Sequence, residues 1–430
     1  MTDLTAYITT FNCARTLPST SHLASSLFSN ANSTLPPDLI VLCLQEIAPI
    51  GYCFLGRSFL APYFSRFSAV VQRAVAQKFD AGVVYSTLLV RNAGMTGLMV
   101  FAREGVEERV RWLETAGVGV GLWDMGNKGA VGARLGVEGR GGETVPVTFV
   151  AAHLAPMEGE WQRRNQDWKS ICEGLVFTRD QLASVRTGSA EAQPLLDDTS
   201  TEAADSSGEH GLFSPLSHIF FAGDLNYRTS DVAPKESDHK HWPHPSSSSD
   251  STTYDELKAR DQLTRELNAR NTLHLLAEEK ITFPPTYKYS SAAQEQAAHQ
   301  KSIKNPHDTE SGAWAKHRVP SWCDRILYLA FSPPKVDSYT ALAVQPTSDH
   351  RPVAMSVSIP LERPERAGET KPPFQIRPGW RERRAAARRL EVLVGIASYL
   401  ALTWEGEALL LGTVVGLLGG YVALRALIGI

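Results

Sequence analysis

Short apolar segments recur through the first 360 residues and are separated by polar or helix-like stretches. Several are continuously apolar, which is typical of strands covered on both faces of a sheet. Helical periodicity predicts helices over Pro62–Gln77, Gly159–Thr187 and Tyr254–Glu279. Many strands with interspersed helices predict an α/β sandwich of two sheets between helical layers. The predicted strands are Leu4–Thr10, Leu39–Leu44, Val83–Val90, Leu98–Ala102, Val118–Trp123, Ala130–Leu135, Val145–Ala152, Ile219–Ala222, Ile326–Phe331 and Val353–Ile359.

Three polar segments interrupt this pattern, at Gly188–Gly211, Asp231–Asp250 and Ser290–Gly312. The first two are rich in Ser, Asp, Pro and Gly, and all three hold few large apolar residues. A segment that buries little apolar surface cannot offset the entropy lost on ordering. We therefore expect flexible insertions at about 188–211, 231–250 and 290–312, within a folded domain that covers residues 1–360.

The composition changes after Pro360. Residues 361–379 are proline-rich, and five arginines follow by residue 389, which predicts a linker over 361–389. Residues 390–430 are strongly apolar, and Ala408–Leu424 is a run of 17 uncharged residues. As a helix, such a run spans about 26 Å, slightly less than a hydrocarbon core of about 30 Å. Arg425 could snorkel, so that the last residues complete the crossing.

We interpret residues 390–430 as a C-terminal membrane anchor with a transmembrane helix and its basic flank in the cytosol. Val392–Trp404, an uncharged run of 13 residues, is too short to cross alone. A single crossing and a hairpin therefore both remain open, and an ordinary core helix is the third interpretation. Met1–Asn12 lacks the basic and apolar regions of a secretory signal.

Composition excludes several classes of protein. The 430 residues include 43% hydrophobic and 21% charged residues, which excludes a wholly disordered chain and a polytopic membrane protein. The net charge of −3 disfavours a protein that coats nucleic acid electrostatically. The five cysteines are scattered without zinc-ligand spacing, which favours a reducing compartment.

Polar residues with catalytic potential follow or precede six of the predicted strands. Each one alone is more often a turn, cap or structural residue. Together they place two histidines, four acids and two asparagines on one rim of a sandwich. This set of side chains suits metal-assisted phosphoester hydrolysis. Carboxylates bind Mg²⁺, an Asp can activate water, and a His paired with an acid can donate to phosphoryl oxygens. These residues are Asn12, Glu46, His153, Asp224, Asn226, Asp324, Asp349 and His350.

The motifs around these residues resemble the inositol polyphosphate 5-phosphatases of the endonuclease/exonuclease/phosphatase superfamily. The resemblance implies a four-layer sandwich of two mixed, mostly antiparallel β-sheets flanked by helices. A catalytic domain followed directly by an apolar tail resembles the fungal tail-anchored 5-phosphatases of the endoplasmic reticulum. The motifs are Thr10–Asn12, Leu44–Glu46, Gly126–Gly129, His153–Leu154, Arg164–Asp167, Gly223–Arg228, Phe283–Lys288, Pro320–Arg325 and Ser348–Val353.

The resemblance implies a role for each matching residue. Asp224 would activate the attacking water, and Asn226 would hold a phosphate oxygen. His153 would contact the phosphate and be oriented by Asp324, while His350 would stabilise the developing charge. No covalent phosphoenzyme is expected, because the chain has no Cys-x5-Arg nucleophile motif.

The metal and the substrate are implied in the same way. Glu46 would bind Mg²⁺, with Asn12 beside the metal and the phosphate and Asp349 next to the metal. A phosphate held by several cations and a phenol gains charge-assisted hydrogen bonds. The predicted substrate-binding residues are Asn127, Lys128, Arg164, Asn165, Tyr287, Lys288, Lys316, Arg318 and Arg325. Without the flanking motif, Lys316 and Arg318 would read as solvated loop charges, and Asn127 and Lys128 as a hairpin turn.

The sequence therefore predicts a Mg²⁺-dependent phosphatase that removes the 5-phosphate of phosphatidylinositol 4,5-bisphosphate by direct attack of an activated water, leaving phosphatidylinositol 4-phosphate. It would act as a monomeric catalytic domain on the cytosolic face of the endoplasmic reticulum membrane. A phosphatase for soluble inositol 1,4,5-trisphosphate is the alternative. A nuclease is disfavoured by the 4-phosphate motif, and a catalytically dead phosphoinositide tether by the intact set of acids and histidines.

Overall fold

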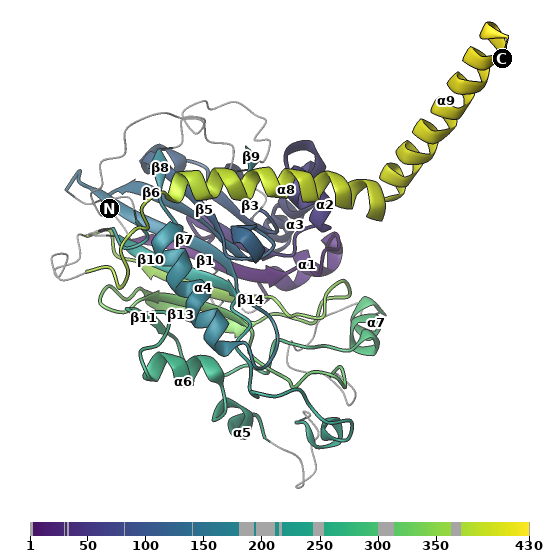
Figure 1. Ribbon diagram of the computed structural model, residues 1–430. Helices are drawn as coiled ribbons and strands as arrows, with labels where there is room; N and C mark the ends of the chain where they lie inside the picture. The colour runs from purple at the N-terminus through teal and green to yellow at the C-terminus, as the bar shows by residue number, and fades with distance from the viewer. Residues whose placement is uncertain are drawn as a thin grey trace.

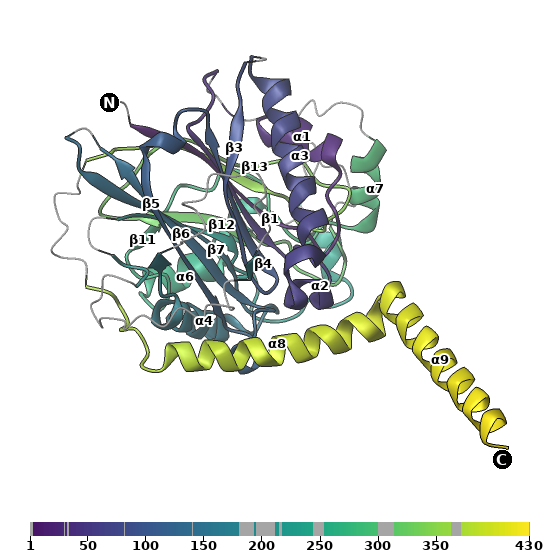
Figure 2. The same cartoon turned by 90° about the horizontal axis from the view of Figure 1, so that it is seen from above.

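The computed structural model describes residues 3–29, 31, 34–80, 82–139, 141–179, 193–194, 211–214, 217–243, 253–299, 314–362 and 371–429. Two seven-stranded sheets pack face to face and helices cover their outer faces. Of the two long helices at the C-terminus, the first lies along the domain and the last projects away from it (Figures 1 and 2). The predicted sandwich of two mixed sheets flanked by helices is confirmed.

The first sheet has the strand order β13-β14-β1-β2-β4-β3-β9. The pairs β1–β2 and β3–β9 are parallel and the others antiparallel. The register of β1 on β2 places Asn12 opposite Gln45, so Asn12 and the residue that follows Gln45 leave the sheet at the same rim. The strands are β1 (Leu4–Asn12), β2 (Leu39–Gln45), β3 (Tyr85–Ala93), β4 (Thr96–Arg103), β9 (Gln193–Pro194), β13 (Lys335–Ala341) and β14 (Val353–Ile359).

The second sheet has the order β11-β12-β10-β7-β6-β5-β8, with β10–β7 as its parallel pair. Asp224 at the end of β10 lies opposite His153 on β7 and opposite Asp324 on β12. Three predicted site residues thus stand in one row across three strands. The strands are β5 (Val110–Gly119), β6 (Gly129–Glu138), β7 (Thr144–His153), β8 (Thr178–Arg179), β10 (His218–Asp224), β11 (Leu276–Glu278) and β12 (Asp324–Leu329).

Three apolar layers hold the sandwich together. One lies between the sheets, a second between the first sheet and α1 and α3, and a third between the second sheet and α4 and α6. In α3 the buried Phe64, Phe67, Val71 and Val75 recur at helical spacing, which is why this segment forms a helix with one apolar face. The helices of the domain are α1 (Thr20–Leu27), α2 (Ile50–Leu55), α3 (Ala61–Lys78), α4 (Trp161–Gly174), α5 (Tyr254–Lys258), α6 (Gln262–Asn268) and α7 (Ser291–His299), with 3₁₀ turns at Arg57–Phe59, Glu107–Arg109, Leu122–Asp124 and Asp238–His241.

The C-terminal region forms two helices, α8 (Trp380–Leu402) and α9 (Trp404–Ile428). An 18-residue stretch of α9 has a mean hydropathy of 1.8, and none of its residues is buried. By length and composition, α9 is able to cross a membrane. The structure differs from the predicted boundary at residue 390, because α8 runs through it and packs along the domain (Figure 2). The arginines of residues 381–389 thus belong to a docked helix and not to a linker.

Other local predictions were wrong at their edges. The strand expected at Val118–Trp123 is instead β5, which ends at Gly119. The helix expected over Tyr254–Glu279 is divided into α5, α6 and β11, because the Asp261 carboxylate caps a new helix by accepting the Thr264 N–H. The helix expected over Gly159–Thr187 ends at Gly174, and residues 180–187 lie outside the described part of the chain.

The predicted insertions are only partly described. Residues 291–299 of the third one form α7, because Ala293 and Ala297 of this helix pack beside Trp314 and Tyr289. The expectation of an unstructured segment was wrong there. Residues 300–313 and 244–252, and most of 188–211, lie outside the described residues.

Candidate active site

Asp224 lies at the centre of the strand-end residues and is buried. Its Oδ2 accepts a hydrogen bond of 2.8 Å from Asn12 Nδ2, which connects the two sheets, and lies 3.3 Å from His153 Nε2 and 3.8 Å from His350 Nε2. Its Oδ1 accepts the Asn226 N–H at 3.1 Å. Burial raises the pKa of Asp224, but His350 and His153 have a larger effect in the opposite direction. The pKa of Asp224 therefore lies well below its usual range. Asp224 is therefore a carboxylate held in place by donors.

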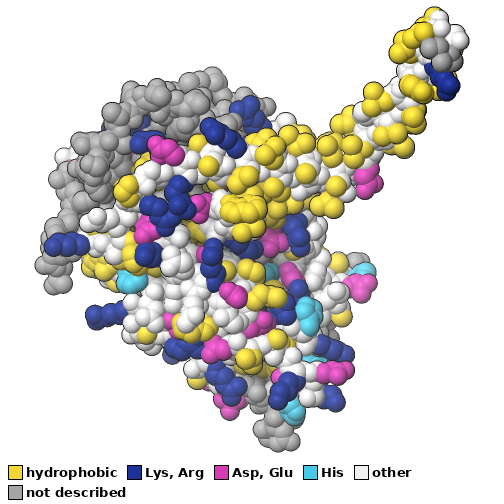
Figure 3. Space-filling view, in the orientation of Figure 1, with side chains coloured by type: hydrophobic (Ala, Val, Ile, Leu, Met, Phe, Trp, Pro, Cys, Tyr) yellow, Lys and Arg dark blue, Asp and Glu magenta, His cyan; other side chains and the backbone are white. Residues whose placement is uncertain are grey.

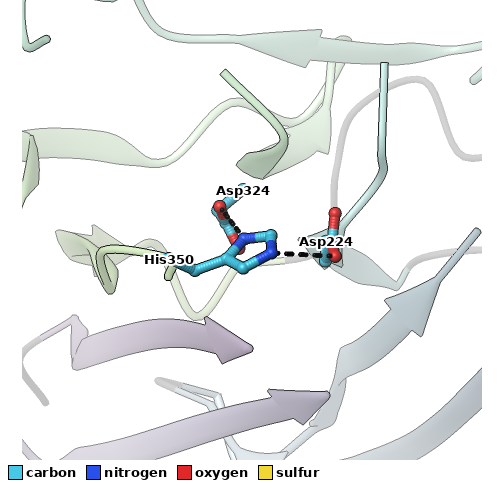
Figure 4. Close-up of side chains that lie close together, drawn as sticks. All are labelled: Asp224, Asp324 and His350. Atoms are coloured by element: carbon cyan, nitrogen blue, oxygen red, sulfur yellow. Dashed lines mark hydrogen bonds and ion pairs between the residues drawn. The ribbon is translucent and has the colours of Figure 1, made fainter. Parts of the chain in front are cut away.

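The His350 ring lies between two aspartates, as Figure 4 shows. Its Nδ1 is 2.9 Å from Asp324 Oδ2, which also accepts a 2.7 Å hydrogen bond from Thr286 Oγ1. The Tyr287 ring packs on the imidazole with centroids 4.5 Å apart. Burial lowers the pKa of His350, but Asp324 and Asp224 raise it to about 9, so the ring holds a proton at neutral pH. This site thus has a fixed cation beside a fixed anion.

Glu46 follows β2 and is only partly buried. Its carboxylate lies 3.1 Å from Arg15 Nε and 3.6 Å from Lys128 Nζ, and Lys128 Nζ is 2.8 Å from His153 Nε2. Burial raises the pKa of Glu46, but His153, Lys128 and Arg15 bring it below its usual value. Burial lowers the pKa of Lys128. Glu46 is therefore a carboxylate that carries its negative charge at neutral pH and is paired with two cations.

A metal ion has two candidate positions at this rim. Among the described residues, Asp224, Asp324 and His350 form a group whose ligand atoms lie within 4.8 Å of one another and could hold an ion. The second position is Glu46, beside Asn12, whose Oδ1 accepts the Ala14 N–H at 3.0 Å. Since Mg²⁺ prefers oxygen ligands and keeps several waters, Glu46 and Asn12 fit it better than a cluster containing a protonated imidazole.

The predicted 4-phosphate residues lie beside His350: the Tyr287 ring packs on it, and the Ala315 N–H donates to the Lys288 carbonyl at 2.9 Å, which brings the 315–318 segment next to Lys288. Lys288 Nζ is 2.8 Å from Asp349, which therefore pairs with a cation at this position. Arg318 is 3.7 Å from Glu158, and its Nη2 contacts Met157 Sδ. The remaining cation of the group, Lys316, is exposed. The Asn127 Oδ1 is buried without a hydrogen-bond partner and packs against Gly121.

Three predicted substrate-binding residues instead support the fold. Arg164 is fully buried and donates to the Ala155 and Met157 carbonyls and to Gln262. The other two, Asn165 and Arg325, are held by acids: Asn165 by Glu266, and Arg325 by Asp261 and Glu278. Most of the donors of these three side chains bind groups inside the protein, so the structure gives them a supporting role and does not place them at a substrate.

One predicted partnership was also wrong. Asp324 orients His350 and not His153, since β12 and the loop before β14 bring Asp324 to the Nδ1 side of His350. His153 instead faces Asp224 and Lys128. The Asn226 side chain donates to the Leu154 carbonyl and accepts from Arg228, so it is fixed in place at the rim.

Four residues of the site received no role from the sequence. Thr286 fixes Asp324, the Arg228 guanidinium stacks over the Tyr287 ring at 4.4 Å, and the Ser348 hydroxyl donates to the Asn12 carbonyl. These three lie inside the motifs that revealed the site, so position within a motif was their only signal. The fourth, Arg15, has no such signal, because its pairing with Glu46 comes from the turn after β1.

Comparisons with known proteins agree with this geometry. Residues 9–356 match the model of endonuclease/exonuclease/phosphatase family 2. The chain is 28% identical over 345 residues to type II inositol polyphosphate 5-phosphatase 14 of Arabidopsis thaliana, an alignment that covers 73% of this chain and 27% of that protein. It is 30% identical over 287 residues to phosphatidylinositol 3,4,5-trisphosphate 5-phosphatase 2B of Danio rerio, covering 65% and 19%. The chain thus spans less than a third of the length of these relatives.

A solved structure shares the fold. The inositol polyphosphate 5-phosphatase domain of a synaptojanin, in complex with inositol (1,4)-bisphosphate and calcium ion, superposes with a TM-score of 0.57 at 23% identity. The match covers 91% of this chain and 92% of that one. With the family model matched across the sandwich, the chain belongs to endonuclease/exonuclease/phosphatase family 2, and it is similar to inositol polyphosphate 5-phosphatases.

Proposed function

We propose that the protein is a Mg²⁺-dependent phosphoinositide 5-phosphatase that converts phosphatidylinositol 4,5-bisphosphate to phosphatidylinositol 4-phosphate. The observation that carries the proposal is the buried Asp224 carboxylate, held between Asn12, His153 and the His350–Asp324 pair. An anion fixed beside a protonated imidazole supplies a base for water and a donor for phosphate in one place.

The chemistry follows from these positions. Asp224 orients a water and accepts its proton as the water oxygen bonds to phosphorus. The bond between phosphorus and the inositol 5-oxygen breaks, and this leaving oxygen takes up a proton from bulk water. His350, kept protonated and oriented by Asp324, donates to a phosphoryl oxygen that gains charge in the transition state. Asn226 and His153 complete the cradle for the phosphate oxygens.

Glu46 and Asn12 are the residues that would hold Mg²⁺. A divalent ion held by these two residues would supply positive charge to the transferring phosphoryl group. The Glu46 carboxylate also pairs with Lys128 and Arg15. Lys128 also reaches His153 and is placed to contact the scissile phosphate.

The residues around Lys288 suit a lipid that bears a 4-phosphate. Lys288, Lys316 and Arg318 bring three cations to one side, as a second phosphate requires. Leu122 and Trp123, in the 3₁₀ turn before Asn127, and Met157, which contacts Arg318, provide apolar side chains for a bilayer surface, with 63%, 67% and 49% of each exposed. A membrane substrate accounts for these apolar side chains, whereas a soluble head group does not require them.

The proposed location is the endoplasmic reticulum membrane, with α9 as the anchor and the catalytic domain in the cytosol. The uncharged stretch Ala408–Leu424 is short for a crossing, which suits this thin bilayer better than the plasma membrane. Figure 3 shows apolar side chains covering α9 and continuing along the outer face of α8. Leu393 and Ile396 belong to this face, with 64% and 45% exposed.

A phosphate-release assay tests the function. The full chain is assayed on each phosphoinositide in mixed vesicles and, separately, on soluble inositol 1,4,5-trisphosphate. Cleavage of single-stranded DNA is followed by gel electrophoresis. We expect the highest kcat/KM on phosphatidylinositol 4,5-bisphosphate. Faster turnover of the soluble trisphosphate would favour the alternative phosphatase, and cleavage of DNA would favour a nuclease.

Replacing Lys288 or Lys316 with Ala should weaken hydrolysis of substrates that carry both the 4- and 5-phosphates. Each lost charged hydrogen bond should cost about 1.5–3 kcal/mol in kcat/KM, roughly tenfold or more. Activity on phosphatidylinositol 5-phosphate should change far less, because no 4-phosphate is present to be held. Lys335→Ala, an exposed lysine on β13, is the matched control. Equal losses on both substrates would show that the two lysines support structure and do not select the substrate.

Ending the chain after Thr403 should release the protein from membranes, because α9 is removed while α8 stays docked. Activity on soluble inositol 1,4,5-trisphosphate should stay within about twofold, whereas turnover of vesicle lipid should fall about tenfold or more with the loss of high effective concentration at the surface. Fractionation and the two assays measure this. A shortened chain that still sediments with membranes in high salt would rule out α9 as the anchor.

A further inference from the structure

The helix that precedes the anchor is packed tightly against the catalytic domain. The buried face of α8 holds Ala387, Glu391 and Gly395. A Cβ added to Gly395 would lie 3.0 Å from Phe54 Cβ, and one added to Gly51 would lie 2.9 Å from the Tyr399 backbone nitrogen. Backbones this close leave no room for sliding, so α8 and α2 form one rigid unit.

A buried carboxylate lies in the middle of this interface. Glu391 has no exposed surface, and its Oε1 accepts the Gly126 N–H at 2.7 Å. Its Oε2 lies 3.3 Å from Arg388, whose guanidinium also donates to the Phe54 carbonyl. A buried acid is costly unless its oxygens are bound, and here both are. The partner on the domain side is a single backbone N–H of the turn before β6.

This turn leads directly into the active site. Gly126 precedes Asn127, whose Oδ1 is buried and unpaired, and Lys128, whose Nζ faces His153 and Glu46. The Gly126 carbonyl accepts the Met95 N–H at 2.8 Å, and a Cβ on Gly126 would lie 2.8 Å from Gly94 Cα and 3.0 Å from the Glu391 carboxylate. The turn is thus held between the β3–β4 hairpin on one side and α8 on the other.

We propose that Glu391 is a positioning residue for the phosphatase reaction: its carboxylate fixes the Gly126 turn from outside the catalytic sandwich and thereby sets the place of Lys128. The inference rests on the proposed function. It makes α8 part of the catalytic unit, so that the element joined to the membrane anchor also shapes the phosphate site. Shortening the chain before α8 should therefore impair the chemistry even on a soluble substrate, unlike shortening it after Thr403.

The test uses the full chain in detergent micelles, with soluble inositol 1,4,5-trisphosphate and Mg²⁺, so that orientation on a membrane does not enter. Glu391→Ala should lower kcat/KM about 10- to 100-fold, the scale for misplacing a group by about 1 Å. Glu391→Gln, which keeps an acceptor oxygen, should recover most of the activity. The matched control is Glu382→Gln, an exposed glutamate on the same helix, which should equal the wild type.

A second pair of variants separates positioning from general stability. In a Lys128→Ala background, Glu391→Ala should lower kcat/KM by less than about twofold, because the lysine that it positions is gone. Glu391→Asp keeps the charge but withdraws the carboxylate from Gly126. Its effect on kcat/KM should likewise disappear in the Lys128→Ala background. This variant serves as the test where Glu391→Ala does not fold. Thermal unfolding reports the fold of each variant.

Two results would overturn the inference: wild-type kinetics in folded Glu391→Ala or Glu391→Asp, or an equal loss with and without Lys128. Absence of phosphate release by the wild-type chain would instead contradict the proposed function itself. The two failures are therefore distinguishable in one experiment.

Discussion

Asp224→Asn is expected to lower kcat by at least about 10²-fold while leaving the fold intact, the scale on which general acids and bases contribute. The amide keeps the size of the side chain but can neither accept the proton of water nor balance the positive charge of His350. His350→Ala should cause a loss of similar size, because it removes the donor to the phosphoryl oxygen. Single-turnover phosphate release measures both effects.

The matched control for this pair is Asp255→Asn, since Asp255 lies on α5 with 90% of its side chain exposed. Near-wild-type turnover in folded Asp224→Asn would remove Asp224 from the mechanism. Combining Asp224→Asn with His350→Ala should cost much less than the product of the two single losses, since both residues act on one proton transfer and one phosphate.

Removing the divalent metal is expected to cause the second large loss. Excess chelator should lower phosphate release by at least about 10²-fold, and added Mg²⁺ should restore it, because the metal neutralises charge on the transferring phosphoryl group. Glu46→Gln should raise the Mg²⁺ concentration needed for half-maximal activity, since an uncharged ligand binds Mg²⁺ more weakly. A titration of activity with Mg²⁺ measures this.

The same titration distinguishes the two candidate metal positions. His350→Ala should lower the maximal rate but leave the Mg²⁺ requirement near that of the wild type. If His350→Ala raises the requirement and Glu46→Gln does not, the metal lies in the Asp224–Asp324–His350 group. Full activity in excess chelator would remove the metal from the mechanism.

Much of the sandwich could be predicted from the sequence, because continuously apolar runs are a strong signal for buried strands. Strand ends were informative as well. Parallel pairing of β1 with β2, and of β7 with β10, carries the residues after these strands to one rim. This is why Asn12, His153 and Asp224 meet although more than 200 positions separate the first from the last.

What could not be predicted depended on side-chain partners far away in the sequence. A motif containing Arg164 or Arg325 does not tell whether the guanidinium faces substrate or groups inside the protein, because their acceptors Gln262 and Glu278 lie 98 and 47 positions away. The pairing of Asp324 with His350 was missed for the same reason. It depends on how the loop before β14 crosses the end of β12.

The docked α8 was missed because its sequence has two opposing signals. The arginines of residues 381–389 favour solvent and the residues from 390 onward are strongly apolar, so the segment resembles a basic linker before an anchor. Its buried face is small and depends on close backbone contact at Gly51 and Gly395, which hydrophobic periodicity does not report. Glu391 is a polar residue at the centre of this contact and weakens the pattern further.

The most direct test of the central claim is hydrolysis of inositol 1,4,5-trisphosphate by the full chain with Mg²⁺ in ¹⁸O-labelled water, with the products identified by ³¹P NMR and mass spectrometry. The account predicts that the 5-phosphate alone is released, that each inorganic phosphate carries one labelled oxygen from the first turnover, and that Asp224→Asn abolishes the signal. Loss of the 4- or 1-phosphate, or unlabelled phosphate in the first turnover, would contradict the assignment of this site to direct water attack on the 5-phosphate.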